Sequence, residues 1–176
     1  MPATHVVLLR GINLGGKNKV PMAPLRGHLA DLGCTDVATL IASGNIVLTP
    51  PEGAQIDDLV RTLIADHFSL DIPVVSRTAA DFRASAERHP FAHLESDPRF
   101  LAVGYMSTTP TDENIASLDP ARSPGDSFRV DGREVYVHYA NGTHKSKLTN
   151  AWFERRLATA ITFRNSRTVR RVAEML

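Results

Sequence analysis

Residues 10–19 have the sequence RGINLGGKNK, and the order of the predicted fold can be worked out from this stretch. The apolar run at residues 5–9 predicts a strand before it, and an apolar stripe at helical spacing predicts a helix over 21–32 after it. Glycines allow backbone conformations that other residues avoid, and they leave main-chain amides uncovered. A strand, a glycine-rich turn, positive charge and a helix start are the parts of an anion-binding site.

The remainder of the first half continues in alternating elements. Strands are expected at 37–41, 46–48 and 73–76, and a helix with strong apolar periodicity is expected at 56–68. Ser43-Gly44-Asn45 is a turn signal that joins the first two of these strands into a hairpin. The resulting order, strand–helix–strand–strand–helix–strand, is the ferredoxin-like order.

The second half begins the same order again. Thr78 is expected to cap a connecting helix at 79–87, and Thr109 is expected to cap the next helix, which ends near Leu118. Asp131-Gly132 is the strongest hairpin signal in the chain. The other elements expected here are strands at 100–106, 128–130, 135–139 and 161–164, a helix at 148–158 and a terminal helix ending at Leu176.

These elements predict an α/β (α+β) protein made of two tandem ferredoxin-like βαββαβ subdomains that form one compact unit. The first subdomain is expected at 1–77, a connector helix and loop at 78–98, and the second subdomain with its C-terminal helix at 99–176. Only the order of elements repeats between the halves, because no residue-level repeat is visible.

Composition limits the classes of function. The 176 residues are 43% apolar and 22% charged, and the net charge of +1 gives no broad basic field for wrapping nucleic acid. A single cysteine, Cys34, excludes an internal disulfide and fits a reducing compartment. No apolar run approaches the roughly 20 residues that span a bilayer, and the N-terminus lacks the pattern of a signal peptide. We therefore expect a cytoplasmic protein without a membrane partner; the oligomeric state stays open.

Three predicted helix starts carry the wrong charge. Helix N-termini have partial positive charge, so a cation there costs up to about 1 kcal/mol, whereas a bound anion would make the arrangement favourable. Alternatively, these side chains extend into water and salt screens the cost. Lys17 and Lys19 precede the first of these helices, Lys145-Ser146-Lys147 open the helix at 148–158, and Arg164-Asn165-Ser166-Arg167 open the terminal helix.

The predicted sheet order adds a spatial expectation. In a ferredoxin-like sheet the first and second strands end at one edge, so the glycine-rich loop and the Ser43-Gly44-Asn45 turn should be neighbours. By the same rule, Lys145-Ser146-Lys147 should approach Arg164-Asn165. The candidate ligand-binding residues are therefore Arg10, Gly11, Asn13, Gly15, Gly16, Lys17, Asn18, Ser43, Asn45, Lys145, Ser146, Lys147, Asn150, Arg164 and Asn165.

Several catalytic and cofactor motifs fail on their spacing. Gly11-x4-Gly16-Lys17 matches most of a Walker A loop, but Asn18 stands where the magnesium-binding Ser or Thr belongs. The glycines do not have the spacing of a dinucleotide fingerprint either. His89 and His93 are separated by Pro90, which prevents the helix that would align them on a metal. We expect no metal and no cofactor, and the aromatic residues at which bases could stack are expected to be buried, namely Tyr136, Trp152 and Phe153.

Several of these motifs together resemble a bacterial family called domain of unknown function 1697. They are the stretch at 10–19, Ser43-Gly44-Asn45, Pro90-Phe91, the stretch at 145–151 and Arg164-Asn165. In that family a tryptophan often follows the arginine–asparagine pair, whereas Ser166 follows it here. The resemblance implies a duplicated ferredoxin-like arrangement, and it implies no catalytic residues.

The sequence thus supports three functional hypotheses. The first is a binding module for a phosphate-bearing ligand, either a nucleotide or a nucleic acid, at glycine-rich and basic helix starts. The second is an enzyme that acts on a small anionic metabolite with a lysine as acid or base; whether the chain is an enzyme at all stays open. The third is a structural or interaction domain in which the polar motifs cap loops.

Overall fold

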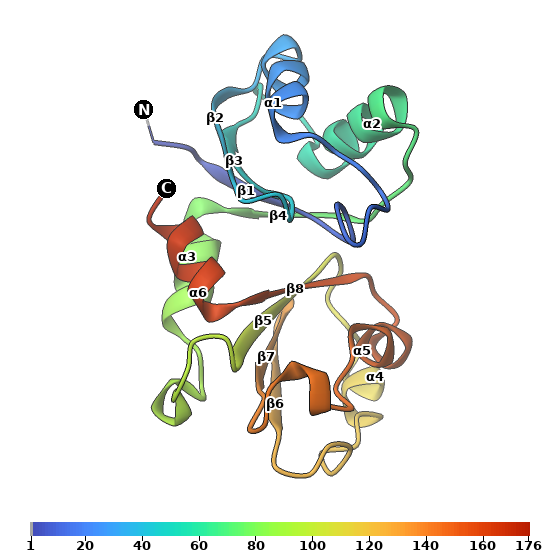
Figure 1. The fold of residues 1–176 in the computed structure, drawn as a ribbon, viewed down its shortest axis with the longest axis vertical. Coiled ribbons are helices and arrows are strands. Elements are labelled where there is room, and N and C mark those ends of the chain that lie inside the picture. The colour runs from blue at the N-terminus through green and yellow to red at the C-terminus, as the bar shows by residue number, and fades with distance from the viewer. Residues whose placement is uncertain (1) are drawn as a thin grey trace. The chain divides into compact units, whose positions relative to one another are not determined.

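The computed structural model describes residues 2–176 and contains eight strands and six α-helices (Figure 1). Two compact units can be distinguished. Unit 1 comprises residues 2–83 together with 171–176, and unit 2 comprises residues 84–170. Each unit contains one four-stranded sheet in which all neighbouring strands are antiparallel.

Unit 1 has the strand order β2-β3-β1-β4, which is the ferredoxin-like order. Helices α1 and α2 cover one face of this sheet (Figure 1), because their apolar stripes pack against the inward residues of β1 and β3. Leu25 and Leu29 of α1 are fully buried there, as are Val60 and Ile64 of α2. The elements are β1 (His5–Leu9), α1 (Met22–Asp31), β2 (Thr35–Leu40), β3 (Asn45–Thr49), α2 (Ile56–Phe68) and β4 (Val74–Thr78).

Unit 2 has the equivalent order, β6-β7-β5-β8. Its core contains an aromatic cluster in which the Trp152 and Phe153 rings lie 4.8 Å apart, with Phe128 edge-on to both. Both residues of that pair are buried, as is Tyr136, so the predicted burial of these aromatic side chains is confirmed. The elements are β5 (Leu101–Met106), α4 (Asp112–Ala116), β6 (Ser127–Asp131), β7 (Glu134–His138), α5 (Asn150–Leu157) and β8 (Ile161–Asn165), with two 3₁₀ turns, η1 (Ala92–Leu94) and η2 (Thr143–Lys145).

The predicted fold of two tandem ferredoxin-like units is confirmed, and both predicted hairpins are present as the pairs β2–β3 and β6–β7. Helix α3 (Ala79–Glu87) has the bounds that the sequence predicts. One predicted cap is wrong: α4 begins after Thr111, whose side chain accepts a hydrogen bond from the Asn114 amide, and not after Thr109.

The two units also correspond residue by residue at one junction, which the sequence does not reveal. In each unit the fourth strand runs directly into a helix, β4 into α3 and β8 into α6 (Ser166–Ala173). The last strand residue caps the helix in both cases. The Asp81 amide donates to Thr78 Oγ1 over 3.1 Å, and the Thr168 amide donates to Asn165 Oδ1 over 2.9 Å.

Candidate functional site

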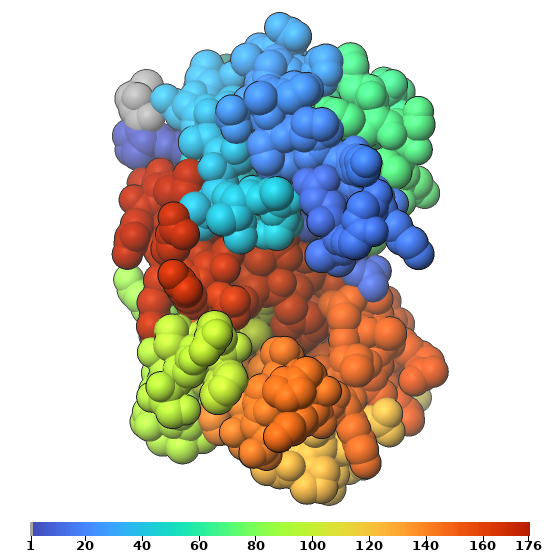
Figure 2. Space-filling model, viewed as in Figure 1, coloured from blue at the N-terminus to red at the C-terminus, as the bar shows by residue number. Residues whose placement is uncertain are grey.

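The glycine-rich loop occupies residues 10–21, between β1 and α1, and it lies at the surface of unit 1, drawn in blue in Figure 2. Its backbone enters the left-handed region repeatedly. Asn13 and Asn18 have φ values of 54° and 49°, which asparagine tolerates better than other residues that have a Cβ atom. The glycines with positive φ are Gly11, Gly15 and Gly16.

Two asparagines of the loop hold it in this shape. Asn13 accepts a hydrogen bond from the Val20 amide at 2.9 Å, and its Nδ2 donates to the carbonyls of Val20 at 2.9 Å and Ala42 at 2.7 Å. Asn18 Nδ2 donates to the Gly11 carbonyl at 2.9 Å. These amide groups therefore serve the loop itself, as the structural hypothesis expects, and they position the backbone for any ligand.

The Ser43-Gly44-Asn45 turn lies beside this loop, as the sheet order predicts. The Leu9 amide at the end of β1 donates to the Gly44 carbonyl at 2.9 Å. A Cβ atom at Gly44 would lie 2.6 Å from Leu9 Cβ, so only glycine permits this approach. Asn45 is buried, and its Nδ2 donates to the Leu40 carbonyl and to Ser43 Oγ, each at 3.0 Å.

Positive charge gathers where the loop meets α1. Lys17 and Lys19 are exposed, and no side-chain hydrogen bond or ion pair holds either of them within residues 2–176. Arg10 is half-buried. The start of α1 has no capping side chain and no acidic residue in its first turn. It opens into a hollow of about 380 Å³ whose lining residues are Asn13, Gly16, Lys19, Val20, Pro21, Met22 and Ala42.

The second predicted cluster, Lys145-Ser146-Lys147, does not lie at the start of a helix. Helix α5 begins at Asn150, and Thr149 caps it by accepting a hydrogen bond from the Trp152 amide. Lys145 ends η2 instead, and Ser146 and Lys147 lie in the segment between η2 and the helix. The prediction that these lysines open the helix is therefore wrong, because the threonine hydroxyl already satisfies the helix start.

One hydrogen bond joins the segment at 145–148 to another part of unit 2, and a second lies within the segment. The Lys147 amide donates to Ser123 Oγ at 3.1 Å, and the Leu148 amide donates to Ser146 Oγ at 3.0 Å. The expected approach of Lys145 and Lys147 to Arg164 stays a prediction.

The third predicted cluster is the end of β8. Asn165 caps α6, so this helix start is also satisfied by its own side chain. Arg164 donates to Thr162 Oγ1 at 2.8 Å and to the Phe163 carbonyl at 2.9 Å. Burial lowers the pKa of the Arg164 guanidinium to about 10, so the group is still charged at neutral pH.

The side chains of residues 2–176 do not favour metal binding or thiol reactivity. Residues 2–176 contain no group of three or more His, Cys, Asp and Glu side chains able to hold a metal ion. Burial raises the pKa of the Cys34 thiol, so this cysteine is poorly reactive. In the same part of the chain, no helix has the length and hydropathy required to cross a bilayer.

One hollow involves none of the predicted site residues. It lies in unit 2, and it is lined by Arg88, Pro90, Arg129, Asp131 and Tyr136. The hairpin signal could have indicated part of it, because Arg129, Asp131 and Tyr136 lie on one face of two strands that pair directly. The contribution of Arg88 depends on the path of the chain after α3, which no local pattern gives.

The fold and this loop define a duplicated ferredoxin-like α/β protein with a basic, glycine-rich loop after its first strand. The chain belongs to the family described as protein of unknown function (DUF1697), whose model matches residues 3–136. It is also similar to the conserved bacterial protein SP0830 from Streptococcus pneumoniae, with a TM-score of 0.75, 26% sequence identity and 99% of each chain covered. Among curated proteins, no relative of this chain is found.

Proposed function

We propose that residues 10–22 of unit 1 bind a phosphate-bearing ligand, either a nucleotide or a nucleic acid. In this proposal Arg10, Lys17 and Lys19 supply the positive charge. The amides of Gly15 and Gly16 and those of the first turn of α1 supply fixed hydrogen-bond donors. Asn13, Asn18 and Asn45 act indirectly, because their amide groups already hold the loop and the adjacent turn in place.

The observation that carries the proposal is the start of α1. Of the six α-helices within residues 2–176, α1 alone has neither a capping side chain nor an acidic residue in its first turn. Helix α2 lacks a side-chain cap but has Asp57 and Asp58, whereas the other four helices have a capping side chain. An uncapped, basic helix start in the absence of an anion is unfavourable by about 0.3–1 kcal/mol per nearby cation. A bound phosphate would reverse the sign of this contribution.

The link before α1 is also longer than the fold requires. In unit 2 the equivalent link from β5 to α4 is made by residues 107–111, and Thr111 with Asp112 completes an ordinary helix start. In unit 1 the link occupies residues 10–21 and brings glycines and cations instead. The comparison supports a role for this loop other than connecting the strand to the helix.

The chain offers a matched control for the binding test. Lys17 and Lys19 have the same spacing as Lys145 and Lys147, and all four side chains are exposed. We would titrate the wild-type protein with polyphosphate, nucleotides and oligonucleotides at low ionic strength. Alanine substitution of the Lys17 and Lys19 pair is expected to weaken binding about tenfold or more, whereas alanine substitution of the Lys145 and Lys147 pair should leave it unchanged.

The outcomes separate the hypotheses. An affinity that falls steeply with salt and shows no preference among mononucleotides indicates nucleic acid. Saturable binding of one nucleotide, with little dependence on moderate salt, indicates a small-molecule site. Equal losses for both lysine pairs would show unspecific charge attraction and refute the proposed loop site, and the absence of any binding would refute it as well. The structural hypothesis would then account for the asparagines.

The alternative of an enzyme that acts on a small anionic metabolite would use the same loop, with Lys17 or Lys19 as acid or base. It is tested by following turnover of any nucleotide or metabolite that binds. A cytoplasmic location, which the single cysteine suggests, belongs to the same proposal.

A further inference from the structure

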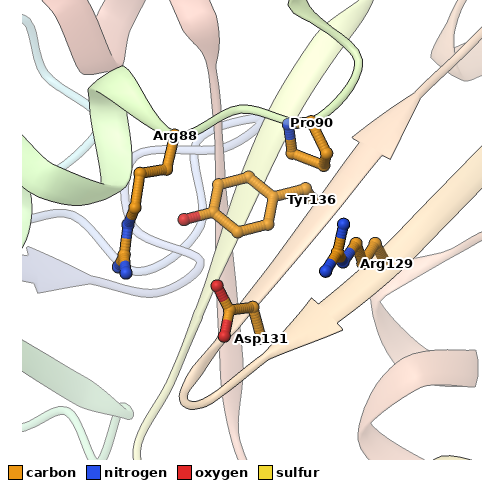
Figure 3. A pocket seen from close by; sticks show the side chains of 5 residues that line it. All are labelled: Arg88, Pro90, Arg129, Asp131 and Tyr136. Carbon is orange, nitrogen blue, oxygen red and sulfur yellow. The ribbon is translucent and has the colours of Figure 1, made fainter.

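The hollow in unit 2 lies on the face of the sheet opposite α4 and α5. Val135 and Val137 of β7 point into the core with α5, so Tyr136 between them points to the other face. Arg129 of β6 is paired directly with Tyr136, and it lies on the same face. Arg88 and Pro90 approach from the segment after α3 (Figure 3), and the hollow has a volume of about 200 Å³.

The hydroxyl of Tyr136 is the unusual group in this hollow. The side chain is 1% exposed, and its hydroxyl has no hydrogen-bond partner among residues 2–176. The His89 ring packs edge-on against the tyrosine ring at 5.2 Å and so fixes its orientation. Buried hydroxyl groups almost always have a partner, so this one indicates a partner from outside the chain.

The protonation state of Tyr136 defines which kind of partner fits. Burial, together with the negative charges of Glu134 and Asp131, raises the pKa of Tyr136 to about 12, although Arg88 acts in the opposite direction through its charge and a weak side-chain interaction with the hydroxyl that is too long for a hydrogen bond. The hydroxyl is therefore protonated at neutral pH and can donate a hydrogen bond. Its natural partner is an acceptor, and an anionic oxygen is the strongest acceptor.

Two arginines among the lining residues can bind an anion. Figure 3 shows the hydroxyl directed toward the side of the hollow where Arg88 lies, with the Asp131 carboxylate nearby and Arg129 on the other side of the ring. Among the lining residues the two guanidinium groups outnumber the one carboxylate, whereas the negative charge of Glu134 on the same face acts against an anion at the hydroxyl. Guanidinium groups suit carboxylate and phosphate oxygens because they offer several donors in one plane.

A second buried atom on this face supports a missing partner. His138 lies two residues after Tyr136 on β7 and therefore on the same face, and its Nδ1 is also buried without a hydrogen-bond partner. This residue does not line the hollow, so we assign it no contact. It shows that this face of the unit has polar atoms that the chain itself does not satisfy.

We propose that this hollow binds a small organic oxyanion, a carboxylate or a phosphate monoester, whose oxygen accepts a hydrogen bond from Tyr136 and is held by Arg88 and Arg129. Asp131 at the rim accepts from a hydroxyl or amino group of the same ligand. The volume is below the roughly 300–1,000 Å³ of pockets for drug-sized ligands, which limits the ligand to a small metabolite. The site is independent of the loop at residues 10–22.

The experiment is a thermal-shift and calorimetric titration of the full chain with four probes. Succinate and glycerol 3-phosphate represent the two kinds of oxyanion, inorganic phosphate tests the bare anion, and glycerol is the neutral control. At least one oxyanion should raise the melting temperature of the wild type. Tyr136→Phe and Arg129→Gln should each weaken its binding about tenfold or more, since each removes a bond to a charged group.

Two variants separate the hollow from other basic surfaces. Arg156→Gln removes an exposed arginine of α5 and should bind like the wild type. Alanine substitution of Lys17 and Lys19 removes the proposed loop site of unit 1, so the oxyanion binding that this variant retains belongs to the hollow. A response to glycerol 3-phosphate alone identifies a phosphate site, and a response to succinate identifies a carboxylate site. Either response supports the proposal.

A further readout requires no ligand. Because Tyr136→Phe removes a buried hydroxyl without a partner and keeps the ring, the ligand-free variant should melt at a higher temperature than the wild type. A lower melting temperature would show that the hydroxyl has a partner within the protein, and it would overturn the proposal. Failure of every oxyanion to bind, or undiminished binding by Tyr136→Phe, would overturn it too.

Discussion

Replacing Asn13 with alanine tests whether the loop asparagines build the site or contact its ligand. The substitution removes three hydrogen bonds of 2.7–2.9 Å to Val20 and Ala42. At roughly 0.5–1.5 kcal/mol each, and at the lower end because water reaches this loop, the bonds contribute about 2 kcal/mol. Alanine is also less suited than asparagine to the φ of 54°, which adds about 1 kcal/mol. We expect the free energy of unfolding to fall by about 3 kcal/mol.

The assay is urea unfolding followed by far-ultraviolet circular dichroism and by fluorescence. The single tryptophan, Trp152, and all three tyrosines belong to unit 2, so fluorescence monitors unit 2 whereas circular dichroism monitors both units. With a urea dependence of about 2 kcal/mol/M, the transition monitored by circular dichroism should move down by about 1.5 M. Asn13→Gly loses the same bonds without the backbone cost, so it should be less destabilised by about 1 kcal/mol.

A change below about 0.5 kcal/mol in Asn13→Ala would refute the structural role, because three bonds within the protein cannot be lost at so small a cost. If such a variant also lost phosphate binding, Asn13 would be a ligand contact. Asn13→Asp keeps the acceptor for the Val20 amide but turns a carboxylate oxygen toward the carbonyls of Val20 and Ala42, so it should lose at least as much stability as Asn13→Ala.

Three further predictions concern unit 2. In Gly104→Ala, the new Cβ would lie 2.6 Å from the Phe163 ring, and overpacking should lower the unfolding free energy by about 1–3 kcal/mol in urea titrations. Thr149→Ala removes the cap of α5, and Trp152 fluorescence should report a loss of about 1 kcal/mol. Burial lowers the pKa of His89, so the unfolded chain binds the proton first. The unfolding free energy should therefore fall as the pH drops below about 6.5, and His89→Gln should flatten that dependence.

The sequence was sufficient for the fold because most elements carry a complete local signal. Helix α2 has an apolar stripe over its whole length, and the Asp131-Gly132 turn fixes one hairpin. The predicted start of α5, at Leu148, precedes the observed start at Asn150 for a physical reason. Leu148 continues the apolar stripe but lies outside the helix, where it belongs to the same core cluster as Phe153 and has the position of a hydrophobic staple before the Thr149 cap.

The candidate site could be predicted only in part. The neighbourhood of the glycine-rich loop and Gly44 followed from the sheet order, because strand ends on one edge are brought together whatever their side chains. The hydrogen-bond partners of the asparagine side-chain amides did not follow from the sheet order. An asparagine in a loop can bond to the backbone or to a ligand, and which of them it reaches depends on carbonyls distant in the sequence, such as that of Ala42 for Asn13.

The two units together distinguish what the fold requires from what it does not. On the face of each sheet away from its main helices, four residues pair across the strands, namely Ala38, Val47, Val6 and Arg77 in unit 1 and Arg129, Tyr136, Val103 and Arg164 in unit 2. The valine and the arginine at the end of the row are common to both. Alanine and valine occupy the positions of Arg129 and Tyr136 in unit 1, so the sheet does not require these two side chains. In the same way, the short link between β5 and α4 in unit 2 shows that the fold does not require the long loop at 10–21. Both features are unfavourable in the absence of a ligand. The loop leaves an uncapped basic helix start, and Tyr136 leaves a buried hydroxyl without a partner; a bound anion would remove each unfavourable contribution.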